Sequence, residues 1–102
     1  MNKLIKAKKV NSDFGLRFRK KQIVYMEKPV NIKVGVDMLF VFFSIDCFFL
    51  NEKFEVIEIK KGLKPFINFY NPKKDFRYLL ECPTGWLVDI NLKDKIEFIN
   101  HL

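Results

Sequence analysis

One carboxylate stands inside the most apolar stretch of this chain. Residues 38–50 read M-L-F-V-F-F-S-I-D-C-F-F-L, and Asp46 is the only charged residue among them. Moving an ionised carboxylate out of water costs several kcal/mol unless the group is paired, hydrogen-bonded or protonated. Asp46 therefore either has a specific structural partner or lies at the edge of a polar pocket.

The two interpretations of Asp46 predict different neighbouring residues. As a structural residue, it would accept backbone N–H bonds or pair with a base, namely Arg19, Lys64 or Arg77. As a functional residue, it would mark a small ligand-binding pocket within an aromatic wall. Arg19, Lys64 and Tyr70 are the other residues that we expect to line such a pocket.

Basic residues are concentrated in the first third of the chain. Residues 1–33 hold ten Lys or Arg against two acidic residues, whereas residues 34–102 hold nine bases against ten acids, so the net charge of +7 is entirely N-terminal. A basic cluster of this kind attracts a phosphate backbone. The alternative function is therefore nucleic-acid association, for which the candidate residues are Arg17, Arg19, Lys20 and Lys21.

Several kinds of enzyme site are excluded by residue counts. The only histidine is His101 and there are two serines, which argues against a Ser-His-Asp hydrolase. Two cysteines and one histidine are too few for a structural zinc site, and the four glycines are too scattered for a phosphate-binding loop. We expect no metal, no cofactor and no enzyme activity. A weaker alternative is acid–base chemistry by Asp46 with Glu58 or Glu81.

The length of 102 residues fits one compact globular domain. The apolar run at residues 38–50 is shorter than the ~20 residues that span a bilayer, and the first ten residues lack the apolar core of a signal peptide. Cys47 and Cys82 are expected to be buried free thiols. We predict a cytoplasmic protein without membrane contact, as a monomer or weak homodimer.

Residue periodicity is chiefly that of strands. Ile45, Cys47 and Phe49 fall on one face of a central strand, opposite Asp46 and Phe48. Strands are predicted at Lys3–Val10, Gln22–Glu27, Val30–Phe43, Ile45–Leu50, Phe54–Lys60, Phe76–Cys82 and Lys95–Ile99, with a loop over Gly62–Lys74.

Two short helices are also expected. One would begin at Ser12 or Asp13 and run to about Arg19, and the other would cover Trp86–Ile90. Trp86 and the cluster of Phe40, Phe42 and Phe43 are expected in the core. The predicted fold is thus mainly β, a compact single-domain sandwich or barrel with one or two short helices.

Several of these elements, in order, resemble a family of small proteins known as domain of unknown function 192 or uncharacterised protein family 0127. Residues 15–19, Gly-Leu-Arg-Phe-Arg, look like its Gly-Leu-Met-x-Arg element, and residues 44–46, Ser-Ile-Asp, look like its Pro-Leu-Asp step. Residues 79–85 resemble its Val-Leu-Glu-x-x-x-Gly element, and residues 90–98 its terminal strand. Arg17, Ser44 and Lys93 depart from the Met, Pro and Gly that are usual in the family.

The resemblance covers about residues 10–98 and implies a compact, mainly β domain with no established activity. Together with Asp46, it leads us to expect a non-catalytic module that binds an unknown small molecule or protein partner.

Overall fold

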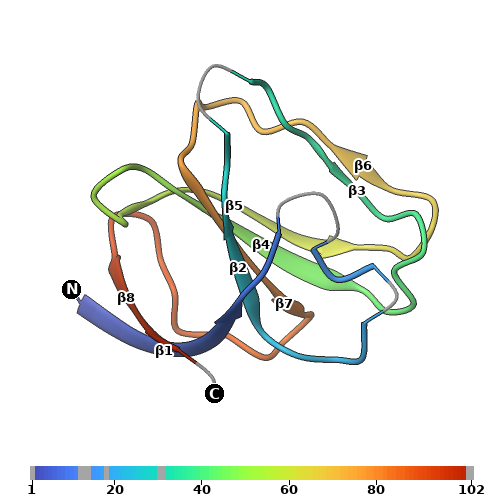
Figure 1. Cartoon of the computed structure of the whole chain (residues 1–102), viewed down its shortest axis with the longest axis horizontal. Helices are drawn as coiled ribbons and strands as arrows, with labels where there is room; N and C mark the ends of the chain where they lie inside the picture. The colour runs from blue at the N-terminus through green and yellow to red at the C-terminus, as the bar shows by residue number, and fades with distance from the viewer. Residues whose placement is uncertain (1, 12–14, 18, 30–31, 101–102) are drawn as a thin grey trace.

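Eight β-strands form the regular structure of the part of the chain that this computed structural model describes, residues 2–11, 15–17, 19–29 and 32–100. Six strands make one sheet in the order β5-β4-β7-β2-β1-β8, and β3 and β6 form a separate two-stranded sheet. Figure 1 shows the small sheet to one side of the large one. The strands are β1 (Asn2–Lys9), β2 (Val24–Glu27), β3 (Val36–Asp37), β4 (Ile45–Leu50), β5 (Val56–Leu63), β6 (Phe69–Tyr70), β7 (Tyr78–Pro83) and β8 (Lys95–Asn100).

The large sheet curls until its edge strands β5 and β8 meet at one end (Figure 1). The Val56 N–H donates to the Asp94 carbonyl over 2.8 Å, and the Ile96 N–H donates to the Phe54 carbonyl over 2.8 Å. Between them, Glu55 forms an isolated antiparallel bridge with β8. The sheet is therefore a curled half-barrel, which confirms the predicted mainly β fold and favours the barrel over the sandwich.

Strand β4 lies between β5 and β7, and all six of its residues are buried. Cys47 and Phe49 contribute to one hydrophobic cluster, together with residues such as Leu16. Phe48 and Leu50 contribute to the second cluster, on the opposite face. The predicted division of this strand into two faces is confirmed, and both faces are covered, as the apolar sequence requires.

The six strands of the large sheet correspond to strands predicted from sequence, with ends shifted by up to three residues. The long strand predicted at Val30–Phe43 is wrong in its described part. Within that segment only the two residues of β3 form strand pairs, and their partners are in β6. The strand does not continue past Asp37 because the Asp37 carboxylate accepts the Leu39 N–H and so turns the chain.

The expectation that Phe40 and Phe42 are core residues is also wrong. Phe40 has a φ of 60° in the turn after β3, and both rings are exposed. They contact the Phe66 ring from the 65–67 turn, edge to face. Phe43 is half-buried against the first cluster.

Neither predicted helix is found in the described residues. Ser12 and Asp13 lie outside them, and Gly15 to Arg17 form a turn, closed by an Arg19 N–H bond to the Leu16 carbonyl. Trp86 follows a turn and is half-exposed, so it is not a core anchor. Segments of roughly five to eight residues cannot offset the cost of helix nucleation unless tertiary contacts support them.

Cys47 and Cys82 are buried and free, as predicted. They belong to different hydrophobic clusters, so their side chains point to opposite faces of the sheet. Within the described residues, no helix is both long enough and apolar enough to cross a membrane.

Candidate functional site

Asp46 is 2% exposed and accepts two backbone hydrogen bonds. Its Oδ1 accepts the Gly62 N–H over 2.8 Å, and its Oδ2 accepts the Gly85 N–H over 3.1 Å. Both glycines have positive φ, a conformation that an L side chain would strain. The carboxylate therefore ties the end of β5 to the turn after β7, which is the structural role considered for it from the sequence.

The other residues expected around an Asp46 pocket have separate partners. The Arg19 guanidinium donates to the Gly15 carbonyl over 2.8 Å, and Lys64 is exposed. Tyr70 donates its hydroxyl to Glu58, and this hydrogen bond raises the pKa of Tyr70 to about 12. In the part of the chain that is described, no hydrogen bond or ion pair joins Asp46 to Arg19, Lys64 or Tyr70.

The four bases considered for nucleic-acid binding also divide. Arg17 forms an ion pair with Asp37, and Arg19 is bound to a carbonyl, as noted above. Lys20 and Lys21 are exposed in the loop before β2. The two arginines thus bind other groups of the protein. Of these four bases, Lys20 and Lys21 are the two that form no ion pair with a described residue.

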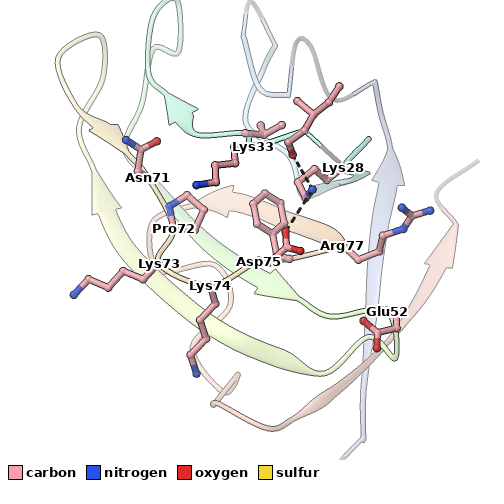
Figure 2. Close-up of a pocket in the computed structure, with 12 residues that line it drawn as sticks. Lys28, Lys33, Glu52, Asn71, Pro72, Lys73, Lys74, Asp75 and Arg77 are labelled. Atoms are coloured by element: carbon pink, nitrogen blue, oxygen red, sulfur yellow. Dashed lines mark hydrogen bonds and ion pairs between the residues drawn. The ribbon is translucent and has the colours of Figure 1, made fainter. Parts of the chain in front are cut away.

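A larger cavity than the space around Asp46 lies elsewhere, in a groove between Lys28 and residues 32–34 on one side and residues 71–77 on the other. Its volume is about 880 Å³. Five of the residues that line it are basic and two are acidic, so positive charge predominates. The lining residues are Lys28, Ile32, Lys33, Val34, Glu52, Asn71, Pro72, Lys73, Lys74, Asp75, Phe76 and Arg77 (Figure 2).

A buried lysine stands in the wall of this groove. Lys28 is 7% exposed, and its Nζ donates to the Ile32 carbonyl over 2.8 Å and to the Pro29 carbonyl over 3.2 Å. The Asp75 carboxylate lies 3.6 Å from Nζ and is almost fully exposed. Nζ also lies 5.7 Å from the centre of the Phe76 ring. The ammonium is therefore fixed in position by carbonyls, and its contact with a carboxylate is long.

The opposite rim is held by Glu58 of β5. Its carboxylate accepts the backbone N–H groups of Lys73 and Lys74, each over 3.0 Å, as well as the Tyr70 hydroxyl. Partial burial opposes ionisation of Glu58, but these hydrogen bonds outweigh it and lower the pKa of Glu58. One carboxylate thus fixes the backbone from which two groove lysines extend.

The basic side chains of the groove differ from one another in whether they form an ion pair. Arg77 is paired with Glu27, whereas no ion pair is formed by Lys33, Lys73 or Lys74 within the described residues. Figure 2 shows Lys73 and Lys74 extending outward from the rim. The sequence analysis did not single out this groove. The turn residues 71–75, Asn-Pro-Lys-Lys-Asp, are the signal that could have indicated a basic loop.

Comparison with known proteins gives consistent results. The DUF192 family model, described as Uncharacterized ACR, matches residues 5–98. A UPF0127 protein of Pyrococcus furiosus is 34% identical over 89 residues, which cover 82% of this chain and 75% of the relative. A UPF0127 protein of Thermococcus sibiricus is 28% identical over 78 residues, covering 74% of this chain and 49% of the relative.

Among solved structures, a crystal structure of a protein of unknown function from Novosphingobium aromaticivorans has the same fold. The TM-score is 0.62 and the identity is 15%, over 82% of this chain and 63% of that chain. The match thus spans about half of the Thermococcus relative and less than two thirds of the Novosphingobium protein.

Proposed function

The chain belongs to the DUF192 family of uncharacterised proteins, and we propose that it is a ligand-binding domain whose basic groove takes a small anionic molecule. The ligand class is a small molecule that bears carboxylate or phosphate groups. The observation that carries the proposal is Lys28, a buried ammonium in the wall of a groove of about 880 Å³. Binding of a ligand, rather than its chemical conversion, is the proposed activity.

The size and charge of the groove support this function. Pockets for small molecules usually measure about 300–1,000 Å³ and combine apolar walls with a few placed polar groups. Ile32, Val34 and Phe76 give apolar surface here, and the unpaired Lys33 gives charge. Two of the three N–H groups of Lys28 are used by carbonyls, so the third is available to a ligand anion that displaces the exposed Asp75 carboxylate.

The groove replaces Asp46 as the proposed binding site because both Asp46 oxygens already accept backbone N–H groups. A cytoplasmic location remains part of the proposal. It is supported by the two free buried thiols, which suit a reducing compartment.

The test is to titrate the protein with citrate, and separately with pyrophosphate, at low salt and to measure the heat of binding by calorimetry. The variant Lys33→Gln/Lys73→Gln/Lys74→Gln should lose affinity by about tenfold or more, since the loss of even one hydrogen bond between charged groups costs roughly 1.5–3 kcal/mol. The matched control removes three exposed bases from β1 and β8, as Lys6→Gln/Lys8→Gln/Lys95→Gln. It changes the net charge equally and should keep its affinity within about twofold.

An equal loss in both triple variants would show that net charge, not the groove, governs binding, and would contradict the proposal. A short single-stranded RNA, titrated in parallel, tests the rival function. Steeply salt-dependent RNA binding that needs Lys20 and Lys21 but not the groove lysines would favour nucleic-acid association instead.

A further inference from the structure

Glu81, in the middle of β7, is buried among hydrophobic side chains. It pairs in register with Val24 of β2 and with Cys47 of β4, and it is 5% exposed. Val24 and Cys47 belong to the first hydrophobic cluster, so the Glu81 carboxylate is turned into that cluster. A carboxylate in such surroundings requires hydrogen-bond donors or a cation if it is to be ionised.

Within the described part of the chain no side chain or backbone group is hydrogen-bonded to the Glu81 carboxylate, and Arg17 attracts it without forming an ion pair with it. No hydrogen bond and no ion pair is formed there by either carboxylate oxygen of Glu81, in contrast to the two donors of Asp46. Instead, the side chain lines a cavity of about 50 Å³ that is distinct from the basic groove. The carboxylate thus faces this cavity without a donor from the described residues.

Gly15 keeps that space open. A Cβ at this position would lie 2.8 Å from Oε1 of Glu81, and the φ of Gly15 is +52°, where a side chain is strained. The Gly15 N–H donates to the Asn11 carbonyl, 3.3 Å away, and so does not serve the carboxylate. The absence of a side chain therefore leaves an oxygen of Glu81 accessible from the cavity.

The remaining charges of the cavity balance each other. Arg17 and Asp37 both line it and form an ion pair, and both are partly exposed, so the cavity reaches the surface beside them. With this pair neutral overall, an ionised Glu81 gives the cavity a net charge of −1. The other lining groups are apolar, among them Met26, Val41 and Leu79.

We propose that the Glu81 cavity is a second binding site, which takes a primary ammonium group on a short alkyl chain. An ammonium carries three N–H donors and one positive charge, which match an acceptor-only carboxylate and the net charge of the cavity. The methylene groups suit the apolar lining. A water molecule needs roughly 10–15 Å³ of such space, so the cavity has room for about four atoms of that size.

This volume excludes rings and nucleotides, and fits the nitrogen and two carbons of ethylammonium. The same chemistry occurs in a free alkylamine and at the tip of a lysine side chain. The proposal is independent of the basic groove, because no residue except Val34 lines both cavities.

Affinity for the ammonium should depend on pH through Glu81. Burial raises the pKa of Glu81 to about 7; the charge of Arg17 lowers it, and that of Asp37 raises it. On the β4 side, Glu81 faces the Cys47 thiol, whose own pKa is raised well above the usual value, chiefly by burial. On the β2 side it faces Val24. Since only the ionised carboxylate binds a cation, affinity should be about tenfold weaker at pH 6 than at pH 8.

The experiment follows the ¹³C signal of the Glu81 carboxyl and the amide signals of Gly15 and Glu81 by NMR during titration with ethylamine hydrochloride. A ligand of three heavy atoms binds no tighter than about millimolar, so the titration extends to ~100 mM. Saturable shifts are expected at these positions in the wild-type protein. Sodium chloride at the same ionic strength and ethanol, which resembles ethylamine without the charge, should give no saturation. A separate titration with Nα-acetyl-lysinamide shows whether the site also accepts the ammonium group of a lysine side chain or only that of a free alkylamine.

Two variants and one control complete the test. Glu81→Gln removes the charge with little change of shape, and Gly15→Ala fills the space beside Oε1, so both should lose ethylammonium binding by at least tenfold. Glu97→Gln removes an exposed carboxylate from β8 and should bind as the wild type does. Because the ¹³C titration of the wild type needs no variant, a misfolded variant does not compromise the test. Absence of saturation with both amines, or equal binding by a folded Glu81→Gln protein, would overturn the proposal.

Discussion

Two buried carboxylates in this molecule have different surroundings. Asp46 receives one backbone N–H on each oxygen, from two glycines that lie 23 residues apart in the chain. Glu81 lines a cavity and has a raised pKa. The first carboxylate is a permanent link between two loops, and the second is able to change its protonation or its partner.

Replacing Asp46 with asparagine tests the structural role. The amide in Asp46→Asn keeps one acceptor oxygen but places an NH₂ group against the other backbone donor, so one of the two backbone N–H groups loses its acceptor and the buried NH₂ group gains none. We expect the free energy of unfolding to fall by about 1–3 kcal/mol, measured by urea denaturation. Asp89→Asn, at an exposed position, should change it by no more than about 0.5 kcal/mol. The same urea midpoint in both variants would argue against the link.

At the residue scale, the sequence predicted that Asp46 is a buried charge, whereas Glu81 was considered only as a possible partner in acid–base chemistry. Asp46 interrupts an apolar run, and that contrast is visible without a structure. Simple alternation along residues 76–82 places Glu81 opposite Leu80 and Cys82, on a face that would meet solvent, yet both faces of β7 are covered. The same reasoning, applied to the apolar neighbours Leu80 and Cys82, would have indicated a second buried charge.

Turns, more than strands, give this fold its individual features. Four residues other than glycine have positive φ, among those described: Phe40, Phe54, Phe66 and Lys93. Two of them, Phe40 and Phe66, meet in an exposed aromatic group that also contains Phe42. A bulky residue with positive φ carries backbone strain. These turns therefore keep aromatic side chains outside the core at a cost in stability.

Lys93 allows this strain to be measured. It has a φ of 75° in the turn before β8, is exposed, and donates its N–H to the Val56 carbonyl. Lys93→Gly keeps that hydrogen bond and removes the left-handed penalty of roughly 1–2 kcal/mol, part of which is offset by the greater freedom of glycine when unfolded. The net result should be a rise of about 0.5 kcal/mol in the free energy of unfolding.

The control for this variant is Lys95→Gly, two residues later and inside β8, where glycine should lower the free energy of unfolding by about 0.5–1 kcal/mol. If thermal denaturation shows both variants less stable than the wild type, the left-handed conformation of Lys93 is not a source of strain.

At the element scale, strands were predictable where apolar side chains alternate over four or more residues. This rule failed for residues 38–43, whose phenylalanines suggested a buried strand. The turn that starts at Asp37 leaves Phe40 and Phe42 exposed instead. The family that the sequence resembles usually has glycine where this chain has Lys93, and the positive φ of Lys93 gives the physical reason for that glycine.

The stability of the whole domain is linked to protons through Glu81. Its pKa is about 7 in the folded protein against an ordinary value of 4.5, so the folded state binds the proton more tightly than the unfolded state does. The contribution of Glu81 to the free energy of unfolding is therefore largest below about pH 4.5. It falls as the pH rises from there through the folded-state pKa of about 7. The loss over this range is about 3 kcal/mol, at roughly 1.36 kcal/mol per pKa unit.

Urea denaturation of the wild type and of Glu81→Gln at several pH values between 5 and 8 measures this linkage. The variant has no proton to lose, so its stability should exceed that of the wild type by a margin that grows with pH. Glu58, whose pKa is lowered, acts in the opposite sense in both proteins and cancels in the difference. Parallel curves for the two proteins would contradict the linkage.

At the scale of the molecule, the mainly β class and the strands of the large sheet could be predicted, but not how the sheet curls. Closure depends on hydrogen bonds between residues 54–56 and residues 94–96, which are far apart in sequence and have no distinctive side-chain pattern. The groove likewise arises from segments that meet only in three dimensions, namely Lys28 with residues 32–34 and residues 71–77.

The pairing of β1 sets a limit on how early the sheet can be completed during synthesis. β1 forms six register pairs with β8, but only two with β2. Because β8 is the last strand of the sheet to leave the ribosome, β1 has to wait for all the other strands before it finds its main partner. The hairpin of β4 and β5 is complete before β7 and β8 are made, so we expect the sheet to grow from its middle outward and its assembly to end with the docking of β1.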